Sequence, residues 1–286
     1  MATVSFAAVM NGCRRCNAHA TAGAERVAAE AHGGFFLEDH KLLFCVNAKA
    51  GTNAWMKVLL RLHGDKAWTQ PYPVTVGGKG RTLRLPTANN SQFRHALQDQ
   101  SGYTRIAIVR DPARRLYSTW MDKLHLGHDS RIQNSIVSNQ IHVPVHNFSR
   151  LTFEDFVEHV EDTIDSPSAS DDNQHWRLQS DLCGLKHYGH LFTIYLGAEE
   201  SGLEQQMQLE CVLHEIAQRS PKPALVLSMN DSWAYTQAGT VAKDPHATPH
   251  DATAYSPELI SRVRHMYAKD YEAFFDNRSV CASHLL

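Results

Sequence analysis

The first organised stretch of the chain is an apolar run that stops abruptly and gives way to a helical pattern. Residues 42–46 are all apolar, a turn of small and polar residues follows, and apolar residues then recur over residues 52–63 at helical spacing. A short apolar run, a small-residue turn and a helical period predict strand, tight loop and helix in that order.

The same order returns further along the chain. The apolar residues 106–109 predict a buried strand that ends at Arg110. Asp111 is placed as the N-cap of the next helix and Pro112 as its first residue. The buried stripe of this helix is predicted to be Leu116, Trp120 and Leu124. In an open parallel sheet, both turns lie at the carboxyl edge of the strands, where such sheets bind ligands.

Caps and spacing predict the remaining elements. Thr152 has the position of a helix cap, and the apolar face behind it is Phe153, Phe156, Val157 and Val160. We expect a strand over residues 190–196, a helix over residues 199–219, and a last helix that Ser256 and Pro257 open and that runs to Phe275. The stretches expected to be mainly loops are residues 64–102, 127–150 and 221–254.

Composition narrows the class of protein. The chain has 286 residues, of which 43% are hydrophobic and 20% charged, as in a globular protein of one or at most two domains. A net charge of -2 excludes a broadly basic nucleic-acid-binding protein. The first ten residues lack the basic start of a signal peptide, and no apolar run approaches the ~20 residues that cross a bilayer. Either the protein is intracellular, or this chain lacks an anchor that the natural form carries.

The six cysteines are too sparse for a disulfide scaffold, and Cys45 is expected to be a buried thiol in the first strand. Cys13, Cys16 and His19 have the spacing of half a zinc site. Because no second pair follows at the spacing of a zinc finger, a local disulfide or free thiols are favoured, and no metal site is predicted.

The first turn has the residues of an anion site. A turn between strand and helix aims backbone N–H groups and the helix N-terminus at one point. Lys49 adds a positive charge, Gly51 permits close approach of the backbone, and Thr52 adds a hydroxyl. We therefore expect this loop to hold a phosphate-like group.

The second turn allows two interpretations. Arg110 can bind a phosphate with two hydrogen bonds, and Ser118 can donate a third from the following helix. Alternatively, Asp111 pairs with Arg114 or Arg115 and Ser118 faces solvent. If both turns bind anions, the ligand carries two separated phosphate-like groups. The chain contains no G-x-x-x-x-G-K-[ST] string, and Asp111 is already used as a cap, which argues against ATP.

The two turns resemble the signatures of the carbohydrate sulfotransferases of the chondroitin, dermatan and HNK-1 type. Residues 48–55, AKAGTNAW, are similar to the P-K-x-G-x-T-N-W signature of this family, with Ala48 in place of its Pro. Residues 109–123, VRDPARRLYSTWMDK, match V-R-D-P-x-x-R-L-x-S-x-x-x-D-K nearly completely. Weaker likenesses are His175-Trp176, Cys183 and the stretch from Tyr267 to Phe275, while Lys186 replaces the second cysteine of a family C-x-x-C pair.

The resemblance implies a P-loop-like α/β fold, with a central parallel sheet flanked by helices. Residues 36–286 would form a single sulfotransferase domain behind an N-terminal extension of residues 1–35. The co-substrate would be 3′-phosphoadenosine 5′-phosphosulfate (PAPS), with no metal. The family pattern assigns its 5′-phosphosulfate to Lys49, Ala50, Gly51, Thr52 and Asn53. It assigns its 3′-phosphate to Arg110 and Ser118.

Sulfuryl transfer also needs a group that stabilises the leaving phosphate and a base. Lys49 suits the first role, and His175 is our candidate for the base, with His125 and His128 as alternatives. By resemblance, the acceptor is a glycan hydroxyl and the location is the Golgi membrane system, with a cytoplasmic enzyme as the alternative. A small-molecule acceptor, a nucleotide-dependent kinase and a non-catalytic binding protein stay open as other functions.

Overall fold

The structure is a computed structural model that describes residues 34–69, 90–98, 101–126, 151–164, 174–181, 192–196, 202–227 and 255–276. Several residues singled out in the sequence lie outside these ranges, among them Cys13, Cys16, His128 and Cys183. Within the described ranges, no helix combines the length and the apolar character needed to cross a membrane.

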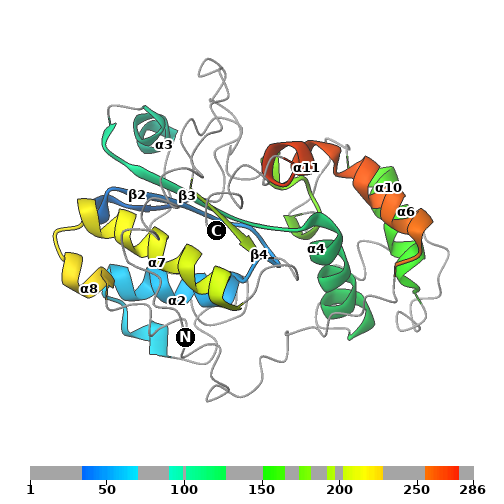
Figure 1. The fold of residues 1–286 in the computed structure, drawn as a ribbon, viewed down its shortest axis with the longest axis horizontal. Helices are drawn as coiled ribbons and strands as arrows, with labels where there is room; N and C mark the ends of the chain where they lie inside the picture. Colours follow the sequence, from blue (N-terminus) through cyan, green and yellow to red (C-terminus); the bar gives the residue numbers. More distant parts are fainter. Residues whose placement is uncertain are drawn as a thin grey trace.

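A four-stranded mixed sheet forms the centre of the fold (Figure 1). Its strands are β1 (Gly34–Leu37), β2 (Leu42–Val46), β3 (Thr104–Arg110) and β4 (Phe192–Leu196). β2, β3 and β4 are parallel, and β1 joins β2 as an antiparallel hairpin through η2 (Glu38–His40). The α/β class is therefore confirmed. The sheet is mixed and not purely parallel, because it includes the antiparallel strand β1, which the sequence did not predict.

Alternate residues of the central strands point to opposite faces of the sheet, and each face is covered by helices. Leu42 and Phe44 pack against α2 (Thr52–His63), α7 (Gly202–Arg219) and α8 (Pro223–Leu227), which lie on one side (Figure 1). Leu43 and Cys45 pack against α3 (Asn90–Leu97) on the other side. A short η3 (Lys66–Thr69) follows α2.

A second group of helices packs beside the carboxyl ends of the strands (Figure 1). Its members are α4 (Pro112–Thr119), the π-helix η5 (Trp120–His125), α6 (Phe153–Thr163), α10 (Pro257–Met266) and α11 (Ala268–Phe274). The predicted caps are confirmed, since the side chains of Asp111, Thr152 and Ser256 each accept a backbone N–H of the helix they open.

Two helices differ from the prediction. The helix that begins at Pro112 changes from α to π geometry at Trp120, and although Leu116 and Leu124 are buried, Trp120 is only partly so. The last helix is broken at Tyr267, whose φ of -103° lies outside the helical range, into α10 and α11.

The face of α2 that packs on the sheet should dominate stability. Leu59 is fully buried in this core, whereas Ile260 on α10 is 40% exposed. We predict that Leu59→Ala lowers the free energy of unfolding by about 2–5 kcal/mol, because it removes buried methyl groups and leaves a cavity. Urea unfolding measures the change, and Ile260→Ala, the control, should change it by less than about 1 kcal/mol. Equal effects would contradict the assignment of this core.

Candidate active site

Hydrogen bonds within the loop between β2 and α2, and from the loop to β3, fix its conformation. The side-chain amide of Asn47 donates to the carbonyl of Ile108 at 2.8 Å, and the Asn47 carbonyl accepts the hydroxyl of Thr52 at 3.0 Å. Gly51 caps α2 with a φ of 70°, a conformation that glycine adopts without steric cost. The adjacent strands β2 and β3 are parallel, so this loop lies beside the turn that follows β3.

Lys49 is a strained and largely buried residue of this loop. Its φ of 66° lies in the left-handed region, which costs a residue with a side chain about 1–2 kcal/mol. Its side chain is 11% exposed, and Nζ donates to Oδ2 of Asp122 at 3.0 Å. Burial lowers the pKa of Lys49, and the neighbouring Asp122 carboxylate opposes this shift. Strain of this kind is often kept where it serves function, which is consistent with an anion site.

Arg110 connects the two predicted turns. Its Nη1 donates to the carbonyl of Lys49 at 3.0 Å. Its backbone is held by Gln179, whose side chain accepts from Arg110 N at 2.9 Å and donates to Arg110 O at 2.8 Å. Burial, followed by the positive charge of Arg114, lowers the pKa of Arg110 to about 10, so the guanidinium stays charged at neutral pH.

Arg115, a residue of the second family signature, holds the site together. Its side chain is 1% exposed, and it donates from Nε to Ala48 O at 2.9 Å. The other two nitrogens donate to the carbonyls of Gln174 and Arg177, each at 2.7 Å. One guanidinium thus fastens residues 174–177 to the loop after β2.

The segment of residues 174–181 brings the candidate base to this region. The Thr119 hydroxyl lies 3.0 Å from the carbonyl of His175, which attaches the segment to α4. The side chain of His175 is partly buried. Ser118, one residue before Thr119, is 3% exposed. The alternative in which Ser118 faces solvent is therefore wrong.

The C-terminal helices hold the same segment from behind. Asp270 is buried and accepts the backbone N–H groups of Gln179 and Ser180 at 2.8 and 2.9 Å. Burial raises the pKa of Asp270, and these backbone N–H groups oppose the shift. The hydroxyl of Tyr267 donates to the carbonyl of Trp176.

The structure thus brings most of the predicted residues to one edge of the sheet. Lys49, Ala50 and Gly51 lie in the loop and Thr52 begins α2, while Arg110 and Ser118 come from β3 and α4; Asn53 is the second residue of α2, and its side chain is outside the described part. His125 ends the π-helix with an exposed ring that lies tilted against Trp120, at 5.0 Å between centroids. Sequence reasoning missed the functions of three residues in this arrangement: Arg115, Asp122 and Gln179.

Two further findings concern the cysteines and metal binding. Cys45 and Cys211 are each disulfide-bonded, so the expectation of a buried free thiol at Cys45 is wrong. Among the described residues, no group of three or more His, Cys, Asp or Glu side chains is arranged to hold a metal ion.

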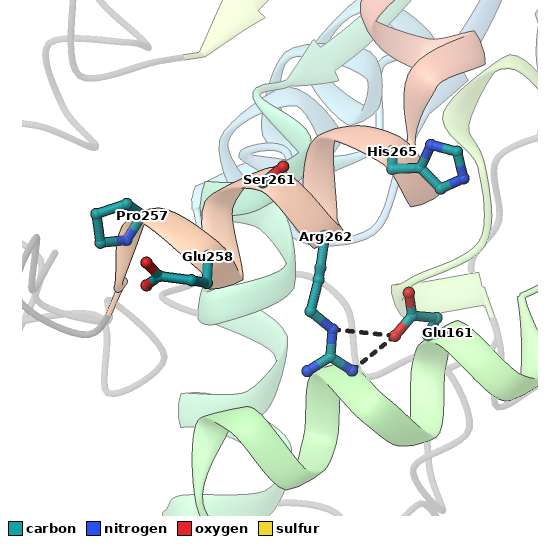
Figure 2. A pocket seen from close by; sticks show the side chains of 6 residues that line it. All are labelled: Glu161, Pro257, Glu258, Ser261, Arg262 and His265. Atoms are coloured by element: carbon teal, nitrogen blue, oxygen red, sulfur yellow. Dashed lines mark hydrogen bonds and ion pairs between the residues drawn. The ribbon is translucent and has the colours of Figure 1, made fainter.

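A surface hollow of about 610 Å³ lies between α6 and α10 (Figure 2). Arg262 crosses it to pair with Glu161 at 2.6 Å, and both side chains are substantially exposed. The residues that line the hollow include none of those predicted for the anion site. We therefore base the candidate site on the two strand-end turns.

These turns, on adjacent parallel strands and carrying the largely buried side chains of Lys49 and Arg110, define an α/β protein with two cationic turns at the carboxyl edge of its sheet. The model of the sulfotransferase family matches residues 33–276, and the chain belongs to that family.

Curated relatives with carbohydrate sulfotransferase names cover part of the chain. Carbohydrate sulfotransferase 10 of Danio rerio is 29% identical over 183 residues, which are 57% of this chain and 50% of the relative. Carbohydrate sulfotransferase 8 of Homo sapiens is 31% identical over 157 residues, or 52% of this chain and 36% of the relative. The chain spans about half the length of the first relatives it matches. No solved structure matches it.

The bonds of Arg115 lead to a prediction about stability. Arg115→Lys retains a charge but cannot reach three carbonyls, so buried acceptors lose their partners. We expect the free energy of unfolding to fall by about 3 kcal/mol or more, as measured by urea unfolding. The control, Arg114→Lys on the same helix, should change it by less than about 1 kcal/mol. If the two substitutions cost the same, Arg115 does not hold the loops together.

Proposed function

We propose that the protein transfers a sulfuryl group from PAPS to a hydroxyl of a carbohydrate. The observation that carries this proposal is the bond from Arg110 Nη1 to the carbonyl of Lys49 at 3.0 Å. It joins two cationic turns at one sheet edge, which suits a donor with two separated anionic groups. Membership of the sulfotransferase family supports the reaction, and the names of the relatives support the acceptor class.

The residues at this edge fit the two ends of such a donor. The loop of Lys49, Ala50, Gly51, Thr52 and Asn53 is assigned to the 5′-phosphosulfate, where a helix N-terminus and a buried ammonium favour negative charge. Arg110 and Ser118 are assigned to the 3′-phosphate. The buried Ser118 and the low exposure of Lys49 place these groups out of bulk water, where electrostatic stabilisation is strong.

Two residues are assigned to the transfer itself. PAPS supplies an activated sulfuryl group bound through oxygen to its 5′-phosphate. His175 takes the proton of the acceptor hydroxyl as that oxygen forms its bond to sulfur in line with the bond that breaks. Lys49 donates a hydrogen bond to the phosphate oxygen on which charge builds as it leaves. The proton then resides on His175, and no metal is assigned a role.

The fold is assigned to the P-loop-like type, and we place the protein in the Golgi. The disulfides at Cys45 and Cys211 support a compartment of the secretory pathway, because disulfides persist in oxidising environments and are rare in the cytosol. The cytoplasm is the alternative location.

A kinase on the same architecture is less well supported. Its magnesium would need a free carboxylate at the strand end, and both oxygens of Asp111 are engaged. Oδ1 accepts from Arg114 N at 2.9 Å, and Oδ2 accepts from the hydroxyl of Tyr271 at 3.2 Å. A sulfotransferase for small molecules shares the donor site and differs in acceptor only.

Donor binding is the first test. We expect adenosine 3′,5′-bisphosphate to raise the melting temperature, by the equivalent of about 2.7 kcal/mol at a hundred times its dissociation constant. Lys49→Ala and Arg110→Ala should remove most of this stabilisation, whereas Lys222→Ala, at an exposed position next to α8, should not. Stabilisation by ATP with Mg²⁺ alone would favour the kinase instead.

The base is tested by turnover. His175→Ala should lower the rate of labelled sulfate transfer to a panel of glycans and small hydroxyl compounds by about 10²–10⁴-fold, while bisphosphate binding is retained. His125→Ala, which alters an exposed ring, is the matched control. If His125→Ala carries the loss, the base has been misassigned. Failure of the wild-type chain to transfer sulfate to any compound in the panel would favour a non-catalytic binding protein.

A further inference from the structure

The π-helix that follows α4 places two oppositely charged side chains beside the lysine of the loop. Oδ2 of Asp122 accepts from Lys49 Nζ at 3.0 Å and from Lys123 Nζ at 3.1 Å. The change to π geometry occurs at Trp120, just before this pair. Local π segments often occur at functional sites, because they re-aim side chains that a regular helix would direct elsewhere.

Both ammonium groups share one carboxylate oxygen, so their Nζ atoms lie within about 6 Å of each other. The Asp122 carboxylate is 2% exposed, and the side chain of Lys123 is 16% exposed, close to the 11% of Lys49. The three side chains therefore form one compact and largely buried group beside the loop that carries Lys49. Two positive charges and one negative charge leave this group with a net positive charge.

Asp122 is the internal anion of this group, and both lysines pair with it. Buried cations need a partner, and in the structure Asp122 is a partner that both lysines share. Burial lowers the pKa of Lys49, Asp122 opposes the shift, and Lys123 adds to it. An anionic group at the loop would offer both ammonium groups the same kind of acceptor that Oδ2 now provides.

We propose that Lys123 is a second cation of the donor site, and that Asp122 is the internal anion that holds Lys49 and Lys123 until a phosphate or phosphosulfate group replaces it. The proposal rests on the proposed function for the identity of that group. It assigns Lys123 a contact with the same end of the donor as Lys49, and it makes Asp122 a competitor for the donor.

The two residues should then affect affinity in opposite directions. Lys123→Met should weaken the binding of adenosine 3′,5′-bisphosphate about tenfold or more, the loss expected for one charge-assisted hydrogen bond, whereas Lys123→Arg should retain most of it. Asp122→Asn should tighten binding severalfold, because the amide no longer competes as an anion. Calorimetric titration at mildly acidic pH, where the amines stay charged, measures both.

The control is Lys66→Met, which removes the same charge from an exposed position in η3, after the opposite end of α2. It should bind like the wild type. Circular dichroism spectra and melting curves of every variant separate lost affinity from lost folding, and the retained binding of Lys123→Arg provides a second safeguard.

Inorganic pyrophosphate separates a failure of the shared anion site from a failure of the proposed donor. If the wild type binds pyrophosphate through Lys123 but not the bisphosphate, the shared anion site stands and the proposed donor is wrong. If Lys123→Met binds as tightly as the wild type while Lys49→Ala does not, this inference is overturned and the proposed function stands. Weaker binding by Asp122→Asn would also overturn it, and a wild type that binds neither ligand overturns both.

Discussion

The arrangement of the site depends on the buried guanidinium of Arg115. Its bonds to the carbonyls of Ala48, Gln174 and Arg177 join the loop after β2 to a segment more than a hundred residues away in sequence. Burial lowers the pKa of Arg115, and the nearby Tyr267 and Asp270 oppose that shift. Only arginine offers a rigid planar fork with several donors, so three backbone acceptors can be satisfied at once without water.

The last two helices complete this arrangement from the opposite side. Tyr267 donates to the carbonyl of Trp176, Asp270 accepts two backbone N–H groups, and the hydroxyl of Tyr271 donates to Asp111. These residues lie in the stretch that resembles the end of the family pattern. Their contacts give that stretch a structural meaning, because it fixes the loops that carry the candidate residues. The polar groups of this stretch therefore have a role without contacting a ligand.

Local patterns were sufficient to predict much of the fold. The two strand–turn–helix units were readable because each strand is continuously apolar and each helix begins with a suitable residue, as the confirmed caps at Asp111, Thr152 and Ser256 show. β1 was missed because four residues after a Gly- and Ala-rich stretch give too short a signal. The π-helix was missed because Leu116, Trp120 and Leu124 have a spacing that fits an α-helix equally well.

The site was predicted less completely, for a physical reason. The family signature over residues 109–123 contains Arg115 and Asp122 as well as Arg110 and Ser118, but a signature does not say which side chains face a ligand and which hold the backbone. Arg115 and Gln179 bind backbone carbonyl and N–H groups, which every residue possesses, so nothing in the partner sequence marks the contact. The pairing of Asp122 with Lys49 spans 73 positions, and it becomes visible only when η5 and the loop after β2 are placed side by side.

These contacts also explain how the proposed anion site can be rigid before a ligand binds. The loop keeps Lys49 in a left-handed conformation and buries its ammonium, and both features are unfavourable in the free protein. Bonds from Arg110 and Arg115 to the carbonyls of Lys49 and Ala48 offset that cost and fix the backbone before any ligand arrives. A phosphate-like group would then find its donors already oriented, so its binding free energy would not be spent on ordering the loop. The rigidity of the loop backbone and the unfavourable burial of the Lys49 ammonium would therefore both favour the binding of an anion.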